Sequence, residues 1–152
     1  MTQTTAGLSF IAADVAVSAD NSTWLDMTPF GASIAVEGGT RKTGEVNTFD
    51  GDTPILTAGK RESVKVTVRY VYTEDAADTG AFETVRTQYE TAGGLLYVRY
   101  SPKARASTVF EFTTGAAIVT DFSYPQGECG DGEPLCDEFT VACAKLTKAA
   151  VT

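Results

Sequence analysis

The sequence contains no histidine, and this absence excludes more chemistry than any residue that is present. This chain therefore cannot use an imidazole as a general base, a proton shuttle or a metal ligand. The sequence also lacks a phosphate-binding loop and a nucleophile elbow. A pair of catalytic carboxylates remains an open alternative, because such residues can be far apart in the chain. We therefore expect a non-enzyme with no catalytic residues, no cofactor and no metal.

Long apolar runs and early basic residues are missing as well. No run approaches the roughly 18 residues that a membrane span needs, and Asp14 interrupts the best candidate, residues 7–19. The first basic residue is Arg41, so the positively charged start of a secretion signal is absent. With 152 residues, 43% of them hydrophobic, the chain is predicted to form a single domain, residues 1–152, with a real core.

Positive charge is scarce: 20 acidic residues face 12 basic ones, and the formal net charge is −8. Residues 1–40 and 121–138 contain acids but no Lys or Arg, and the second stretch contains six acids. This balance opposes binding to a phosphate backbone as the main activity. The simplest interpretation is a solvated acidic surface.

Cysteine is limited to Cys129, Cys136 and Cys143, whose spacing of seven matches no zinc site. Cys143 is in phase with the apolar residues of the last predicted strand, which indicates a small buried core residue. Cys129 and Cys136 belong to an acidic loop predicted over residues 126–138. A disulfide between them and two free thiols are both open interpretations.

The clearest pattern lies between Lys60 and Gly94. Residues 63–72 alternate as in a half-buried strand, with Val64, Val66 and Val68 pointing inward. Apolar residues then recur at helical spacing, which predicts a helix over residues 78–92 with Asp78 and Thr79 as candidate N-caps. Gly93 and Gly94 end it.

Further strands are predicted on both sides of this unit, at residues 13–18, 34–37, 95–100, 109–114, 118–124 and 139–143. Trp24 is expected to anchor the core. Residues 147–152 carry no pattern and are expected to form a frayed tail. The fold class is therefore mainly β, a β-sandwich or barrel flanked by one α-helix.

A long polar passage, residues 38–59, interrupts this pattern and is predicted to form a hairpin with its tip at Asp50-Gly51. Its sizeable apolar residues are too few to build a core of their own. Two interpretations follow: a mobile surface hairpin, or a hairpin that packs on a partner.

The order and spacing of several short motifs resemble the tail tube proteins of long-tailed bacteriophages, from Trp24 to about Leu146. No motif is specific alone. They are Trp24-Leu25-Asp26-Met27, Gly38-Gly39-Thr40-Arg41-Lys42-Thr43-Gly44-Glu45, Thr48-Phe49-Asp50-Gly51-Asp52, Gly59-Lys60-Arg61-Glu62, Val71-Tyr72-Thr73, Val98-Arg99-Tyr100-Ser101-Pro102 and Phe122-Ser123-Tyr124-Pro125.

The resemblance implies a structural virion protein that forms hexameric rings, stacked into a hollow tube through which DNA is delivered. It implies assembly in the host bacterial cytoplasm, tape measure and tail terminator partners, and no membrane insertion. The hairpin is then expected to lie against a neighbouring subunit through Arg41, Lys42, Thr43, Glu45, Phe49, Asp50 and Asp52.

A conduit for DNA should repel its cargo weakly, so its lumen is expected to be net negative. The candidate lining residues are Glu62, Glu111 and Asp121, while Lys65 and Arg69 are expected to pair with acids or to lie at subunit contacts. The rival interpretation is a monomeric β-sandwich module that binds glycan or protein, including a virion decoration domain.

Overall fold

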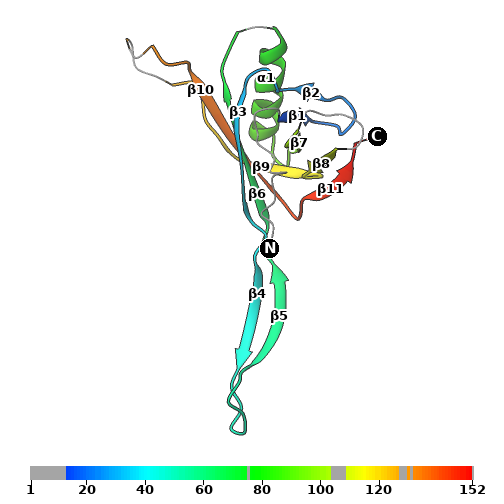
Figure 1. Cartoon of the computed structure of the whole chain (residues 1–152). Coiled ribbons are helices and arrows are strands. Elements are labelled where there is room, and N and C mark those ends of the chain that lie inside the picture. Colours follow the sequence, from blue (N-terminus) through cyan, green and yellow to red (C-terminus); the bar gives the residue numbers. More distant parts are fainter. Residues whose placement is uncertain (1–12, 75, 104–108, 127–129, 131, 152) are drawn as a thin grey trace, which may run out of the picture.

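The computed structural model describes residues 13–74, 76–103, 109–126, 130 and 132–151, and between 76 and 79 it describes the backbone only. Within these ranges the chain forms eleven strands and one helix (Figure 1). In chain order they are β1 (Asp14–Ser18), β2 (Leu25–Asp26), β3 (Gly31–Gly38), β4 (Arg41–Val46), β5 (Ile55–Arg61), β6 (Val64–Val71), α1 (Ala76–Glu90), β7 (Leu95–Ser101), β8 (Phe110–Thr113), β9 (Ala117–Phe122), β10 (Cys136–Cys143) and β11 (Thr147–Ala150).

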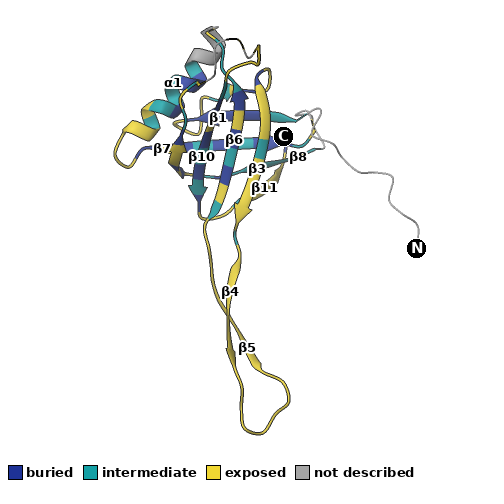
Figure 2. Ribbon diagram, turned by 90° about the vertical axis from the view of Figure 1, so that its left-hand side faces the viewer, coloured by how far each residue is buried: buried dark blue, intermediate teal, exposed yellow. Residues whose placement is uncertain are grey.

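Nine strands form one antiparallel sheet that folds over on itself at β7. The first residues of β7 pair with β9, while later residues pair with β8 and β1. The front layer has the order β9-β10-β6-β3 and the back layer has the order β2-β1-β7-β8-β11. Strands of the two layers cross in Figure 2. β4 and β5 form a separate two-stranded ribbon.

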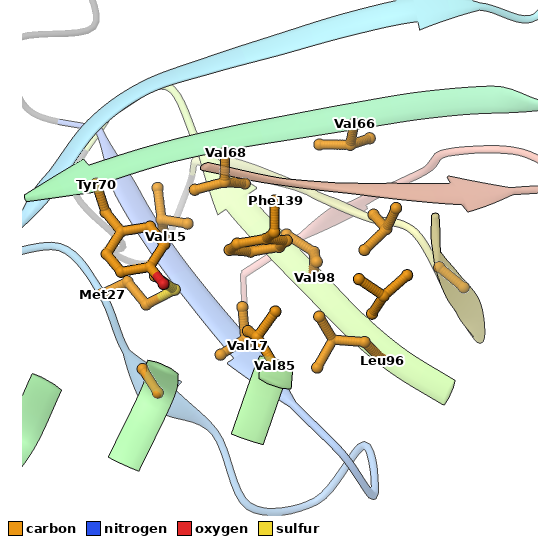
Figure 3. Packing of buried hydrophobic residues seen from close by; sticks show 14 of the residues in the cluster. Val15, Val17, Met27, Val66, Val68, Tyr70, Val85, Leu96, Val98 and Phe139 are labelled. Carbon is orange, nitrogen blue, oxygen red and sulfur yellow. The ribbon is translucent and has the colours of Figure 1, made fainter. Parts of the chain in front are cut away.

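The core lies between the layers, where inward-facing residues of β6 and β10 meet those of β1 and β7 (Figure 3). The alternation predicted for β6 is confirmed, because Val66 and Val68 are fully buried while Lys65 and Arg69 are exposed. Phe139 fills the centre of this space. The predicted fold class, a mainly β sandwich with one helix, is confirmed.

Helix α1 packs against β9, β2 and β7 through Ala81, Phe82 and Val85, which are all buried. It begins two residues before Asp78, so the N-cap prediction at Asp78 and Thr79 was wrong. Ala76 and Ala77 are strong helix formers and extend the helical run. The predicted stop is confirmed, with the helix ending at Glu90 and Gly93 in the left-handed region at φ 74°.

Two predictions for the C-terminal third were wrong. Residues 147–150 are not frayed, because they form β11 and pair with β8. The acidic loop does not reach residue 138, because β10 begins at Cys136 and places Asp137 in the core with 1% of its surface exposed. Cys143 is buried as predicted. The question of a Cys129–Cys136 disulfide lies outside the described residues.

Trp24 is half-buried and not a core anchor. The guanidinium carbon of Arg99 lies 4.2 Å from the centroid of its ring, on the outer side of the back layer. The indole therefore covers a charged side chain of the sheet surface, and the aromatic character that suggested a core position serves a cation–π contact instead.

Candidate assembly interface

The predicted hairpin is confirmed as an extension of the two strands at the edge of the front layer. β3 and β6 pair inside the domain, and their continuations β4 and β5 pair outside it. Every residue of β4 and β5 is exposed. Figure 2 shows the ribbon projecting beyond the body of the domain with no other element beside it. The domain therefore contributes no core to this segment.

Two glycines fix the point where the ribbon leaves the body. Gly38 and Gly39 have φ values of 84° and 73°, in the left-handed region that favours glycine. The Gly39 amide donates to the Ser63 carbonyl at 3.2 Å, and the Glu62 amide donates to the Thr40 carbonyl at 2.9 Å. A Cβ at Gly38 would collide with the Ser63 carbonyl oxygen. The kink is therefore closed by backbone contacts on both strands.

Inside the ribbon the strands approach closely at two further glycines. A Cβ at Gly44 would lie 2.6 Å from Thr57 Oγ1, and a Cβ at Gly59 would lie 2.8 Å from the Lys42 carbonyl oxygen. Arg41 Nη1 donates to the Gly59 carbonyl at 3.1 Å. These contacts hold the register without any buried apolar side chain.

The distal part of the ribbon presents apolar side chains to solvent. Val46 and Ile55 are cross-strand partners on one face, with 63% and 56% of their surfaces exposed. Leu56, on the opposite face, is 66% exposed, and Phe49 in the connecting turn is fully exposed. Burial of one such side chain is worth about 1.5–3 kcal/mol, so this segment is a favourable surface for protein contact.

The seven residues predicted for the subunit interface all lie on this ribbon and its turn, and all are exposed. They are Arg41, Lys42, Thr43, Glu45, Phe49, Asp50 and Asp52. Val46, Ile55 and Leu56 were not among the predicted interface residues. Their signal in the sequence is that, with Phe49, they are the only sizeable apolar side chains of an otherwise polar passage.

The three predicted lumen residues do not share one surface. Asp121 lies on the outer face of the front layer, at a bulge opposite Thr140. Glu62 follows β5 at the base of the ribbon, where its carboxylate is 4.0 Å from Lys42 Nζ. Glu111 belongs to β8 in the back layer. Only Asp121 therefore lies on the broad outer surface of the front layer.

That outer surface is built from small and oppositely charged residues. Thr67 and Thr140 are cross-strand neighbours whose hydroxyl oxygens are 2.9 Å apart. The two predicted basic residues each face an acid across the strands. The pairs are Lys65 with Glu37 and Arg69 with Glu138. Asp121 is then the acid that no cross-strand base balances, since its partner is Thr140.

The large sheet has three end strands, β2, β3 and β11, of which β3 and β11 are exposed along almost all of their length. β3 spans eight residues, and β11 spans four. An edge strand presents unpaired backbone groups, and proteins usually blunt it with Lys or Pro. β3 contains neither residue, although its register shifts between Gly31 and Ser33. This edge is open to pairing with another strand.

The described residues also bear on metal binding and on membrane insertion. No group of three or more acidic or cysteine side chains there could hold a metal ion. None of the helices in the described part is long and apolar enough to cross a membrane.

Among the residues whose side chains the structure describes, Asp137 is the one buried acid, and it is the cross-strand partner of Tyr70. Neither Asp137 carboxylate oxygen nor the Tyr70 hydroxyl has a hydrogen-bond partner in the described structure. Burial raises the pKa of Asp137 to about 6, and the nearby Tyr70 hydroxyl, outside hydrogen-bonding geometry, opposes this rise only in part. Burial, followed by the Asp137 charge, raises the pKa of Tyr70 well above its ordinary value. Because the pair is enclosed in the core, its protonation affects the stability of the protein and does not serve substrate binding.

No protein-family model matches the sequence, and no curated protein matches it significantly. Solved structures do match. A chain of the sheath–tube complex of an extracellular contractile injection system, PVC, in its extended state, matches with a TM-score of 0.66 and 14% identity, covering 99% of this chain and 100% of that one.

Two further structures match over nearly the same extent. A chain of the anti-feeding prophage baseplate has a TM-score of 0.64 and 11% identity, covering 100% of this chain and 99% of that one. A chain from the tail of an empty GTA particle has a TM-score of 0.62 and 14% identity, covering 98% and 100%. The chain thus has the fold found in these tail and injection-system structures, and the predicted resemblance is confirmed at the level of the fold.

Proposed function

We propose that this protein is a structural subunit that self-assembles into stacked hexameric rings, which form the hollow tail tube of a phage-like particle. The observation that carries the proposal is the β4–β5 ribbon, every residue of which is exposed outside its own domain. An isolated two-stranded hairpin is only marginally stable in water. Burial of Val46, Ile55 and Leu56 against another copy would stabilise it.

The fold match supports this assignment because it covers at least 98% of this chain and 100% of each matched chain. Two of the matching structures are described with six-fold or C6 symmetry. A ring needs a heterologous contact, in which two different surfaces of each subunit meet. This chain offers such surfaces in the exposed β3 edge and the projecting ribbon.

We also infer that the tube conducts DNA, and that the outer surface of the front layer faces the bore. Its Lys65 and Arg69 face acids across the strands, so they offer few free contacts to phosphate. Its unbalanced charge is the negative Asp121. Such a surface makes few attractive contacts to phosphate and repels the duplex weakly, so it holds a sliding duplex loosely. The repulsion extends over only about 8 Å at physiological salt. Tape measure and tail terminator proteins would be the partners at assembly.

The competing function is a monomeric β-sandwich module that binds glycan or protein, with Phe49 or another exposed aromatic at the contact. Size-exclusion chromatography of the purified protein, followed by negative-stain microscopy, separates the two. Rings or tubes support the proposal. A 16.1 kDa monomer that remains monomeric at high concentration would refute it.

Replacement of residues 43–54 by a short Gly/Ser turn tests the role of the ribbon. The domain core contains none of these residues, so the variant should keep the circular dichroism spectrum and melting behaviour of a folded monomer. It should no longer polymerise. Tubes of normal length from this variant would show that assembly does not depend on the ribbon.

A further inference from the structure

The charges of the β4–β5 ribbon are separated along its length. Arg41, Lys42, Lys60 and Arg61 lie at its base, next to the body of the domain. The distal part, residues 43–59, contains Glu45, Asp50 and Asp52 and no Lys or Arg. The ribbon is therefore basic at one end and acidic at the other.

The described structure contains no ion pair between these two ends within one copy. Glu45, the acid closest to the base, is three residues from Lys42, which is ~10 Å along the backbone of an extended strand. Charges on an exposed surface are largely screened beyond about 8 Å at physiological salt. The one ion pair described on the ribbon joins Lys42 to Glu62, at 4.0 Å and within the base. The distal acids have no ion-pair partner in the described structure.

The basic end also contains a like-charge pair. Arg41 and Arg61 are direct cross-strand partners. Like charges opposite each other destabilise a two-stranded pair. Lys42 and Lys60 add further positive charge beside them, and the nearest acid is Glu62. An anionic group bound here would relieve this repulsion.

Several other cations of the described chain already face an acid or an aromatic ring. Lys65 and Arg69 face Glu37 and Glu138 across the strands. Arg86 bonds to Glu83 and Glu90 on α1, and Arg99 lies over Trp24. The base of the ribbon gathers four cations on two paired strands, so it is the partner that we assign to the three distal acids.

We propose that the acidic distal part of one ribbon docks on the basic base of the ribbon of the next copy, so that ribbons follow one another head to tail. This rests on the proposed function and specifies its contact. The exposed Val46, Ile55 and Leu56 supply apolar area, while the charges set the register. Successive ribbon bases then lie roughly 30 Å apart, the extended length from Arg41 to Asp50.

Charge reversal with complementation tests the contact. One variant reverses the distal acids (Glu45→Lys, Asp50→Lys, Asp52→Lys), and a second reverses the base (Arg41→Glu, Lys42→Glu, Lys60→Glu, Arg61→Glu). Each variant alone presents like charges at the contact and should lose assembly. A mixture of the two restores opposite charges at every junction, so it should form alternating copolymers. A control with Glu74→Lys and Glu133→Lys, both exposed and off the ribbon, should assemble normally.

Light scattering and negative-stain microscopy give the readout, with circular dichroism to confirm that each variant is folded. Assembly of either reversed variant at the wild-type level would overturn the proposal, as would a mixture that fails to assemble. Closed dimers of about 32 kDa from the mixture would indicate two antiparallel ribbons and would also overturn it. If wild-type protein assembles in each of these cases, the proposed function stands; if wild-type protein itself stays monomeric, both proposals fail.

Discussion

Asp137 gives the protein a stability that decreases as the pH rises from acidic to neutral. This carboxyl is buried in the core with no hydrogen-bond partner in the described structure, and burial raises its pKa from 3.8 to about 6. The folded state therefore keeps the proton in a pH range where the unfolded state has released it. The stabilisation is complete below pH 3.8 and is lost as the pH rises through 6.

The size of the effect follows from the shift. A change of one pKa unit corresponds to 1.36 kcal/mol, so the whole shift corresponds to about 3 kcal/mol, of which about 2 kcal/mol is lost between pH 4.5 and 7.5. Asp20 does not contribute in this range. Hydrogen bonds from the Thr23 and Ser22 amides hold its pKa well below the ordinary value, so it stays ionised throughout.

Urea unfolding of the assembly-deficient Gly/Ser variant, measured by circular dichroism across this pH range, avoids interference from polymerisation. We expect the free energy of unfolding to fall by about 2 kcal/mol towards neutral pH. Asp137→Asn cannot ionise and should flatten the profile. Stability that is constant or rises from pH 4.5 to 7.5, or an unchanged slope in Asp137→Asn, would refute the reasoning.

Three further predictions concern the core, the kink and the bore. Val66→Asp places a carboxylate in the apolar layer and should lower the free energy of unfolding by about 3–5 kcal/mol, measured by thermal or urea unfolding. The control Lys65→Asp, on the exposed face of β6, should change it by less than about 1 kcal/mol. In Gly38→Ala the new side chain would have to adopt a positive φ and would collide with the Ser63 carbonyl oxygen, so the protein should lose about 1–3 kcal/mol of stability. Gly80→Ala in α1 has open space and should stabilise the protein by about 0.5–1 kcal/mol. Equal effects of the two substitutions would contradict the assigned role of Gly38. Assembled tubes should not retain duplex DNA in a filter-binding assay at moderate salt, and tight retention would contradict a weakly negative bore.

The fold was predictable where the sequence pattern depends on local geometry. Val64, Val66 and Val68 alternate with polar or charged residues, and a half-buried strand satisfies that pattern. Gly38-Gly39 and the polar passage after it predicted where the strand ends and the hairpin begins, and the structure places both glycines at positive φ there. These features need no knowledge of the rest of the chain.

The predictions that were wrong concern residues whose structure depends on tertiary partners. Residues 147–150 carry no alternation, and they become a strand because β8 offers them an edge. Asp137 looked like part of a solvated acidic loop, and its burial follows from its register opposite Tyr70 in β6. Glu62, Glu111 and Asp121 could be selected by charge alone, but the placement of Glu111 in the back layer depends on how the sheet folds over at β7.

The proposed assembly depends most directly on the position of the β4–β5 ribbon in the assembled protein. A cryo-EM reconstruction of tubes grown from purified wild-type protein measures that position directly. We expect each ribbon to lie against a neighbouring copy, with Val46, Ile55 and Leu56 buried in the contact. A reconstruction in which the ribbons project freely into solvent, while the rings hold together through other surfaces, would contradict the central claim.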